Sequence, residues 1–175
     1  MSGSDRSVTL RLPSIRRAIG LVAAAVVIAG SVVAGIRTHD LSVSKDRLEH
    51  GLSSFDKSAV AAASGYAVTF ATYRYDSFAA DVAATVAHSV DPFLSQYRSY
   101  TSQLQSGIVE LKARSSAKVI SAGLVSVSST SAVVDVFLDQ TIVNTKKSQV
   151  TPQRITMTMV RSHDRWLISR VQIFS

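Results

Sequence analysis

Cysteine is absent from this 175-residue sequence, and glutamate is scarce. Without cysteine the chain has no disulfide framework, no thiolate nucleophile and no cysteine-based metal site. The two glutamates, Glu49 and Glu110, are too few to favour a paired-glutamate acid and base. The sequence also lacks the GxSxG, GxxxxGKS and GxGxxG patterns of hydrolases and nucleotide-binding folds. We therefore expect a protein that is not an enzyme.

Histidines and basic residues form no recognisable site either. The four histidines are His39, His50, His88 and His163. They show no metal-binding pattern such as HExxH, so we expect no metal and no cofactor. The net charge is +7, of which four arginines and one aspartate in residues 1–17 supply +3, and the remainder contains no run of five basic residues. Because nucleic-acid binding needs a concentrated basic patch, we expect no nucleic-acid partner.

One long hydrophobic run, Ala18–Ile36, contains nineteen residues without a charge. As an α-helix it would be about 28 Å long, close to the hydrocarbon thickness of a bilayer. It exceeds the apolar core of about 7–15 residues in a signal peptide, so an uncleaved signal anchor is favoured over a cleaved leader. The basic tail at 1–17 then stays in the cytoplasm. The sequence thus predicts a single-pass plasma-membrane protein with an extracytoplasmic C-terminal domain.

Small residues recur at four-residue spacing in this predicted span. They are candidates for contact with a partner's membrane helix, because small side chains let two helix backbones approach closely. A span rich in alanine, glycine and valine also shows this spacing by chance, so both interpretations stay open. The candidate contacts are Gly20, Ala24, Gly30 and Ala34.

Beyond the span, the hydrophobic pattern is first helical and then alternating. Residues 37–56 predict a helical stalk, and residues 57–175 predict one folded domain. The fold class is α+β, with helices packed on one face of a curved antiparallel sheet of about four strands. Asp76 fits the N-cap of the second helix. Helices are expected at 57–75, 78–88 and 91–113, and strands at 119–127, 133–143, 155–159 and 166–174.

Three aromatic residues of the first expected helix are candidates for lining a cavity or filling the core. Tyr66, Phe70 and Tyr73 are spaced i, i+4 and i+7, which places their rings on one helical face. An aromatic stripe of this kind usually belongs to a core. In a cone-shaped domain the same rings would suit the wall of an apolar ligand cavity.

A second candidate group lies on the most regular of the expected strands. Asp135, Phe137 and Asp139 alternate with Val134, Val136 and Leu138 and therefore share one face. Two carboxylates on the concave side of a sheet could serve a proton transfer. The simpler alternative is that this face is partly solvated and the aspartates keep it soluble.

Two segments of the C-terminal half resemble a known family: VVDVFLDQTIVNT at 133–145 and RITMTMVRSHDRWLISRV at 154–171. They are similar to the Mce-associated membrane proteins of actinobacteria, accessory proteins of the mammalian-cell-entry lipid transporters. The helical segment at 72–97 and the short basic N-terminus before one span are similar as well. The turn at His163 and Asp164 departs from the Asp-Gly that the family often has there.

The resemblance implies a cystatin-like, nuclear-transport-factor-like cone, similar in plan to the membrane-anchored assembly subunits of type IV secretion systems. It implies a non-catalytic role in assembling or stabilising a lipid import complex, with permease or substrate-binding subunits as partners. It supplies no catalytic residues. Two alternatives remain: a module that binds a lipid or sterol in the cone cavity, and a cone-fold enzyme resembling the isomerases.

Overall fold

The computed structural model describes residues 53–174. The predicted basic tail, span and stalk lie outside the described residues, except for the last four stalk positions, 53–56. Among residues 53–174, no helix is both long enough and apolar enough to cross a membrane. The four candidate helix contacts also lie outside the described part: Gly20, Ala24, Gly30 and Ala34.

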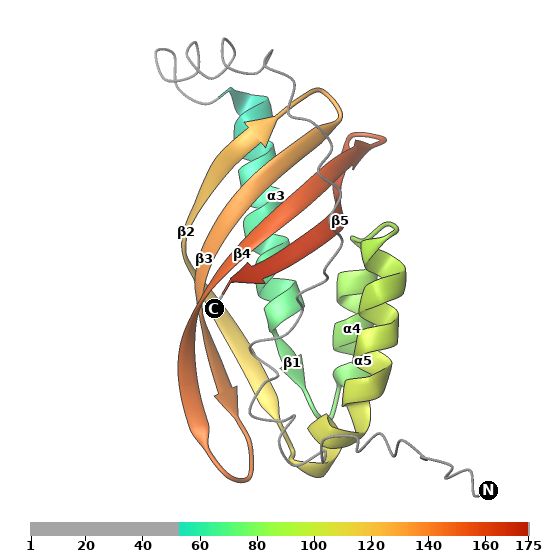
Figure 1. Ribbon diagram of the computed structural model, residues 1–175, viewed down its shortest axis with the longest axis vertical. Coiled ribbons are helices and arrows are strands. Elements are labelled where there is room, and N and C mark those ends of the chain that lie inside the picture. The colour runs from blue at the N-terminus through green and yellow to red at the C-terminus, as the bar shows by residue number, and fades with distance from the viewer. Residues whose placement is uncertain (1–52, 175) are drawn as a thin grey trace, which may run out of the picture.

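The described residues fold into helices on one side of an antiparallel sheet with strand order β1-β2-β3-β4-β5 (Figure 1). This confirms the predicted α+β class. The two-residue β1 was not expected; it pairs only with the start of β2. In chain order the elements are α3 (Ser54–Ala71), β1 (Tyr73–Arg74), α4 (Phe78–Val86), α5 (Phe93–Glu110), β2 (Arg114–Val127), β3 (Ser131–Val143), β4 (Ser148–Ser162) and β5 (Arg165–Phe174).

Helix α3 begins at a capping box and packs on the sheet through alanines. The hydroxyl of Ser53 accepts a hydrogen bond from the Asp56 N–H at 3.1 Å, and the Asp56 carboxylate accepts one from the Ser53 N–H at 3.2 Å. These bonds satisfy N–H groups that have no partner within the helix. Small side chains then let the helix backbone lie close to β2, β3, β4 and β5. The buried alanines recur at every fourth position: Ala59, Ala63, Ala67 and Ala71.

The end of α3 differs from the prediction. The helix was expected to reach residue 75, but it stops at Ala71, and Tyr73 and Arg74 pair with Ser115 and Arg114 of β2. The expected aromatic stripe is therefore split, since Tyr73 belongs to a strand rather than to the helix. Pairing with a segment some forty residues away ends the helix, and local helical spacing carries no signal of that pairing.

Asp76 does not cap the next helix, so that prediction was wrong. Its carboxylate accepts hydrogen bonds from the guanidinium groups of Arg74, at 2.9 Å, and Arg114, at 3.1 Å. Helix α4 instead follows Ser77, whose side chain makes no capping bond. The hydrogen bond from Arg74 holds the pKa of Asp76 below its ordinary value. The ion pairs link β1 to β2 at this end of the sheet.

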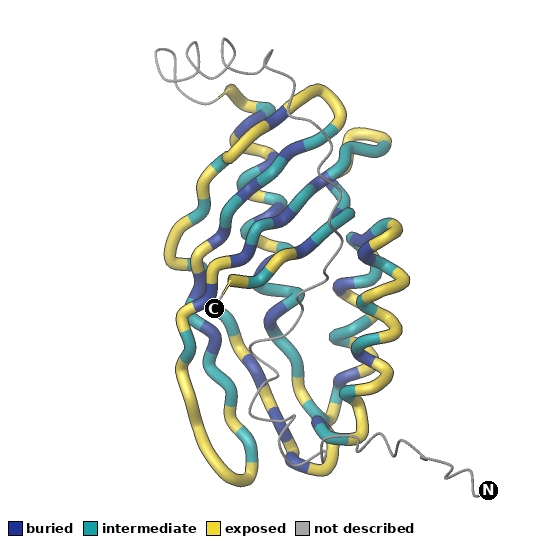
Figure 2. Tube along the Cα trace, in the orientation of Figure 1, coloured by how far each residue is buried: buried dark blue, intermediate teal, exposed yellow. Residues whose placement is uncertain are grey.

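The strands alternate between a buried and an exposed face, as Figure 2 shows along the sheet. On β3, Val134, Val136 and Leu138 share a face, as the alternation predicted, and this face is buried under the helices. The pattern of β2 is less regular because the register with β3 shifts between Val119 and Ser121, and again between Leu124 and Ser126. Each β-bulge adds a residue and changes the phase of the alternation.

The main core lies between α3 and the sheet, and Trp166 ties the start of β5 to the start of α3. Its indole N–H donates to the Ser58 hydroxyl at 3.0 Å, and its ring meets the Phe55 ring edge-on at 5.2 Å. The Tyr66 hydroxyl donates to the Trp166 carbonyl at 3.0 Å. The core residues that surround these contacts include Phe93, Ile155, Met157, Met159 and Ile168.

Candidate functional site

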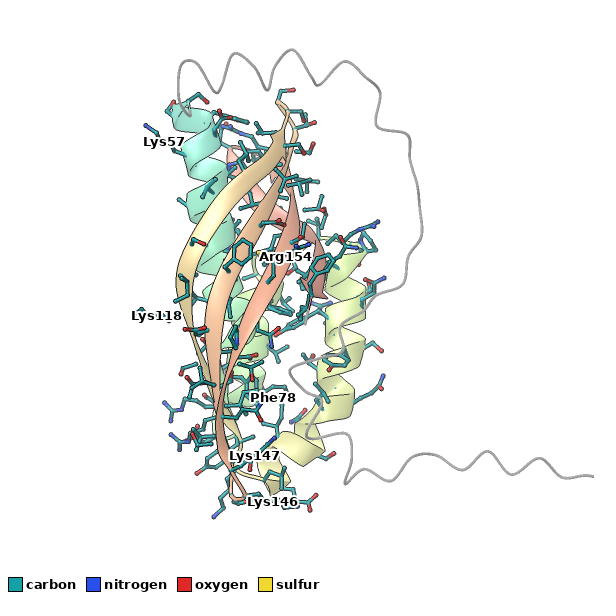
Figure 3. All side chains as sticks on the ribbon, turned by 60° about the vertical axis from the view of Figure 1, so that its left-hand side comes forward. Lys57, Phe78, Lys118, Lys146, Lys147 and Arg154 are labelled. Atoms are coloured by element: carbon teal, nitrogen blue, oxygen red, sulfur yellow. The ribbon has the colours of Figure 1, made fainter. Side chains whose placement is uncertain are left out.

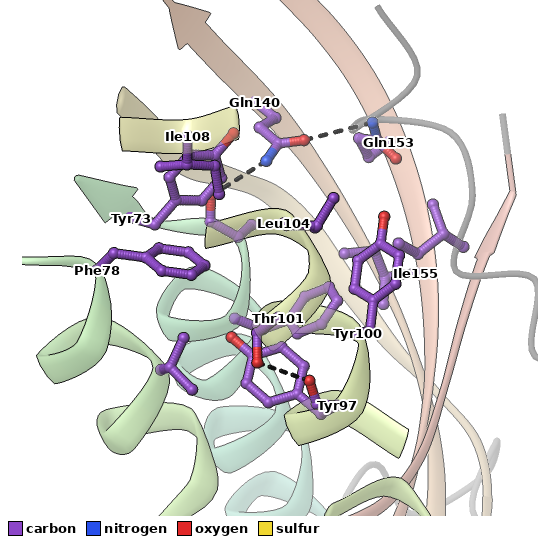
Figure 4. A pocket seen from close by; sticks show the side chains of 14 residues that line it. Tyr73, Phe78, Tyr97, Tyr100, Thr101, Leu104, Ile108, Gln140, Gln153 and Ile155 are labelled. Carbon is purple, nitrogen blue, oxygen red and sulfur yellow. Dashed lines mark hydrogen bonds between the residues drawn. The ribbon is translucent and has the colours of Figure 1, made fainter. Parts of the chain in front are cut away.

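A cavity of about 60 Å³ lies where α4 and α5 face the lower part of the sheet (Figure 4). Aromatic and aliphatic side chains form most of its wall, so it is apolar. Its volume is small beside the roughly 300–1,000 Å³ of ordinary ligand pockets. The side chains that face it include Phe70, Tyr73, Phe78, Tyr97, Leu104 and Ile155.

Gln140 and Gln153 lie at the polar end of the cavity, and their side-chain N–H groups donate hydrogen bonds within the protein. The Gln140 amide donates to the Ala71 carbonyl at 3.1 Å and to the Ser115 hydroxyl at 2.9 Å. Ser115 in turn donates to the same carbonyl at 2.7 Å. The Gln153 amide donates to the Gln140 side-chain oxygen at 3.5 Å, as Figure 4 indicates. The network fastens the end of α3 to β2, β3 and β4.

The tyrosines of the cavity remain protonated at physiological pH. Burial raises the pKa of Tyr73 from 10.0 to about 12, and the neighbouring Tyr100 adds to the effect. Burial also raises the pKa values of Tyr97 and Tyr100. A general base must lose its proton near the working pH. The raised pKa values of these hydroxyls make that loss harder.

The structure separates the six residues predicted to line a cavity or core. Phe70 and Tyr73 face the cavity. Tyr66 does not line it; its ring stacks on His88 with the ring centroids 4.4 Å apart. The other three, Asp135, Phe137 and Asp139, lie on the face of β3 that points away from the helices.

The two aspartates therefore do not face the helix-covered side of the sheet, where an active site was considered. The alternation of β3 assigns that side to Val134, Val136 and Leu138. Asp135 instead accepts a hydrogen bond from the Thr156 hydroxyl on β4. Asp139 is four residues further along the strand, about 13 Å away, which is too far for the two carboxylates to act on one proton. Within residues 53–174, no group of three or more acidic or histidine side chains could hold a metal ion.

The same side of the sheet carries exposed apolar side chains. Ile120 is 59% exposed, and Phe137 and Phe174 are each 44% exposed. Register places Phe137 beside Arg154 and Arg154 beside Phe174, and the Arg154 guanidinium lies 4.2 Å from the centre of the Phe174 ring. An open hollow of about 330 Å³ lies between Ile120, Phe137, Asp139, Pro152 and Arg154. We call the surface formed by Ile120, Phe137, Pro152, Arg154 and Phe174 the outer sheet face; Figure 3 locates Arg154 on it.

The sequence pointed to only one member of this surface, Phe137, and as a cavity residue. The signal in the sequence was the large ring of Phe137, which lies between two aspartates on the same face of the expected strand. Ile120 could not be assigned to a face because it falls at the first bulge of β2. Arg154 and Phe174 come together only through the pairing of β4 with β5.

Comparison with known proteins supports the fold. No family model matches the chain. An uncharacterized protein of Mycobacterium tuberculosis, found in strains CDC 1551 and H37Rv, is 31% identical over 119 residues, which are 65% of this chain and 53% of the relative. The chain thus spans about half the length of the curated relatives it matches.

Solved structures similar to this one come from type IV secretion systems. The periplasmic domain of DotI has a TM-score of 0.60 at 15% identity, over 71% of this chain and 97% of that domain. VirB8 of Agrobacterium tumefaciens gives 0.58 at 12% identity, over 70% and 94%. An IcmL-like type IV secretion protein of Legionella pneumophila gives 0.58 at 10% identity, over 71% and 94%. At these identities the likeness establishes the fold alone, a cone-shaped α+β domain.

Proposed function

We propose that this chain is a non-catalytic, membrane-anchored accessory protein that assembles or stabilises an Mce-type lipid import complex in the cell envelope. The observation that carries the proposal is the outer sheet face, where three large apolar side chains stay exposed on one side of a rigid sheet. Contiguous exposed apolar surface marks contact with proteins, membranes or ligands, and we assign this one to a protein partner. The role parallels that of the secretion-system proteins that share the fold.

The choice of an Mce-type complex rests on the resemblance of segments 133–145 and 154–171 to the Mce-associated proteins. In this proposal the predicted span at 18–36 anchors the chain in the plasma membrane, and the domain at 57–175 lies outside the cytoplasm. Permease or substrate-binding subunits of the transporter are the proposed partners. They would contact the span, the outer sheet face or both.

The alternative of a lipid- or sterol-binding module is less well supported by the cavity. A volume of about 60 Å³ is well below the roughly 300–1,000 Å³ of pockets that hold ligands of drug size. The amides of Gln140 and Gln153 at the polar end also donate to the protein's own groups. Binding of a lipid there would require α4 and α5 to move away from the sheet.

Affinity purification of the full-length protein from its native membrane, with analysis of the proteins and lipids that accompany it, separates the two functions. We expect the permease and substrate-binding subunits of a lipid transporter. A stoichiometric lipid without a protein partner would instead establish the binding module. Topology has its own measurement: the C-terminal domain should be cleaved by protease added outside intact spheroplasts, and protection would place it in the cytoplasm.

A further inference from the structure

Two turns that are distant in sequence meet at one end of the molecule and concentrate basic residues there. The turn at 111–113 follows α5, and the turn at 144–147 joins β3 to β4. The Thr145 N–H donates to the Leu111 carbonyl at 3.0 Å and holds the two turns together. Glu110, the last residue of α5, borders the first turn. We call this end the basic tip; its lysines are Lys112, Lys146 and Lys147, and the neighbouring Arg114 is ion-paired with Asp76.

Local hydrogen bonds give the basic tip a defined shape. The Asn144 side-chain oxygen accepts from the N–H groups of Lys146, at 2.8 Å, and Lys147, at 3.1 Å. These bonds use the backbone and leave both side chains exposed at the end of the hairpin, as Figure 3 shows. Lys112 has φ of 48°, a left-handed conformation that glycine adopts with less strain. A cation there also complements the negative end of the α5 dipole.

Apolar side chains flank these cations. Val143 is 44% exposed and Val150 is 60% exposed. Val150 pairs with Thr141, two positions before Val143, so both valines lie on the same face of the hairpin. A surface that carries exposed cations next to apolar side chains can bind at the boundary between lipid headgroups and acyl chains.

We propose that the basic tip docks on the surface of a bilayer that contains anionic lipids. Its shape favours lipid over an acidic protein: the tip is a convex hairpin end, which suits a flat surface (Figure 1). Each lysine or arginine near an anionic bilayer contributes about 1 kcal/mol, or about fivefold in binding. The inference is independent of the outer sheet face and so goes beyond the proposed function.

The docking would define how the domain is oriented. The tip lies at the end of the domain opposite the start of α3 (Figure 1). Residues 37–52 lie between the predicted span and α3; they would reach about 24 Å as the predicted helical stalk and at most about 55 Å if fully extended. Strand β4 has 15 residues, or about 50 Å. The extended tether is therefore long enough for the domain to lie along the membrane with its tip on the headgroups.

A site-specific fluorophore tests this docking, because the chain contains no cysteine of its own. Thr145→Cys places an environment-sensitive label on the tip, and Ser129→Cys places one in the exposed turn between β2 and β3, at the other end of the sheet. Full-length protein is reconstituted into vesicles of phosphatidylcholine alone, or of an equal mixture with phosphatidylglycerol, and labelled from outside.

We expect a blue shift of the Thr145→Cys label only in the phosphatidylglycerol vesicles, and the same emission from the Ser129→Cys label in both kinds of vesicle. High salt should abolish the shift by screening. Lys146→Gln and Lys147→Gln, introduced together into the Thr145→Cys protein, should weaken binding of the tip to the bilayer about 25-fold, at about fivefold for each lysine. The melting temperature should not change. Equal emission from the tip in both vesicles would overturn the proposal. A blue shift that persists in the glutamine variants would also overturn it. So would a tip label that shifts in native membranes but not in phosphatidylglycerol vesicles, because that result would indicate an acidic protein partner.

Discussion

Single residues around the cavity show how burial governs their ionisation. Tyr73 lies between α4, α5 and the sheet, and its ring meets Phe78 edge-on with the ring centroids 6.0 Å apart. A phenolate at this position would lose its hydration, so the protonated form is strongly favoured in the folded domain. The effect makes Tyr73 a reporter of the packing of α4 and α5 against the sheet.

The first prediction follows from this raised pKa. The Tyr73 pKa is 10.0 when exposed and about 12 in the fold. Folding therefore favours the protonated hydroxyl, and the contribution is complete below pH 10 and lost as pH rises toward 12. The free energy of unfolding should fall by roughly 2–3 kcal/mol across this range, at about 1.4 kcal/mol for each pH unit.

Chemical denaturation between pH 9 and about 12 measures this slope. The control is Tyr73→Phe, which keeps the ring and removes the titrating hydroxyl. It should show a smaller loss, with the remainder due to Tyr97 and Tyr100, whose pKa values burial also raises. Identical slopes in the two proteins would mean that Tyr73 is solvated in the folded state.

Among the elements, α3 depends most on side-chain size. Its stripe of buried alanines brings the helix backbone close to β2 and β3, and Ala59, Ala63 and Ala67 are fully buried. Densely packed interiors resist added volume. The close approach of α3 to the sheet therefore depends on these small residues.

The second prediction is that Ala63→Leu destabilises the domain by at least about 1–3 kcal/mol, because the larger side chain must push the helix away from the sheet. Ala61→Leu is the matched control, since Ala61 lies on the exposed face of the same helix. It should change the free energy of unfolding by less than about 0.5 kcal/mol. Equal effects of the two substitutions in denaturant titrations would contradict the close packing of α3.

Elements with a regular pattern could be predicted, and those determined by distant pairing could not. The alternation of β3 correctly separated its residues into two faces. It did not indicate which face the helices cover, and the cavity candidates Asp135, Phe137 and Asp139 lie on the opposite one. The end of α3 was missed because β1 forms only by pairing with Ser115 and Arg114. The side chains of the outer sheet face were mostly missed, since a bulge obscures Ile120 and cross-strand register brings Arg154 to Phe174.

In the whole molecule, the two sides of the sheet have different roles. One side is covered by the helices, the core and a small cavity. The other presents the outer sheet face, where Phe137 and its neighbours stay exposed in the described part of the chain. A rigid sheet with one covered and one open side suits a protein that positions partners, which is the proposed role of this chain beside a lipid transporter.

The most direct test of that role compares transporter recovery with two full-length variants in the native membrane. Phe137→Asp puts a charge in the centre of the outer sheet face. Ala61→Asp puts the same charge on the exposed face of α3, away from the outer sheet face and from the basic tip. Both should retain the melting temperature of the wild type. If Phe137 is a central hot-spot residue, its loss costs about 2 kcal/mol or more. We therefore predict that Phe137→Asp lowers the amount of permease and substrate-binding subunits recovered per bait by about thirtyfold, while Ala61→Asp recovers as much as the wild type. Equal recovery with all three proteins, or no transporter subunit with the wild type, would contradict the account.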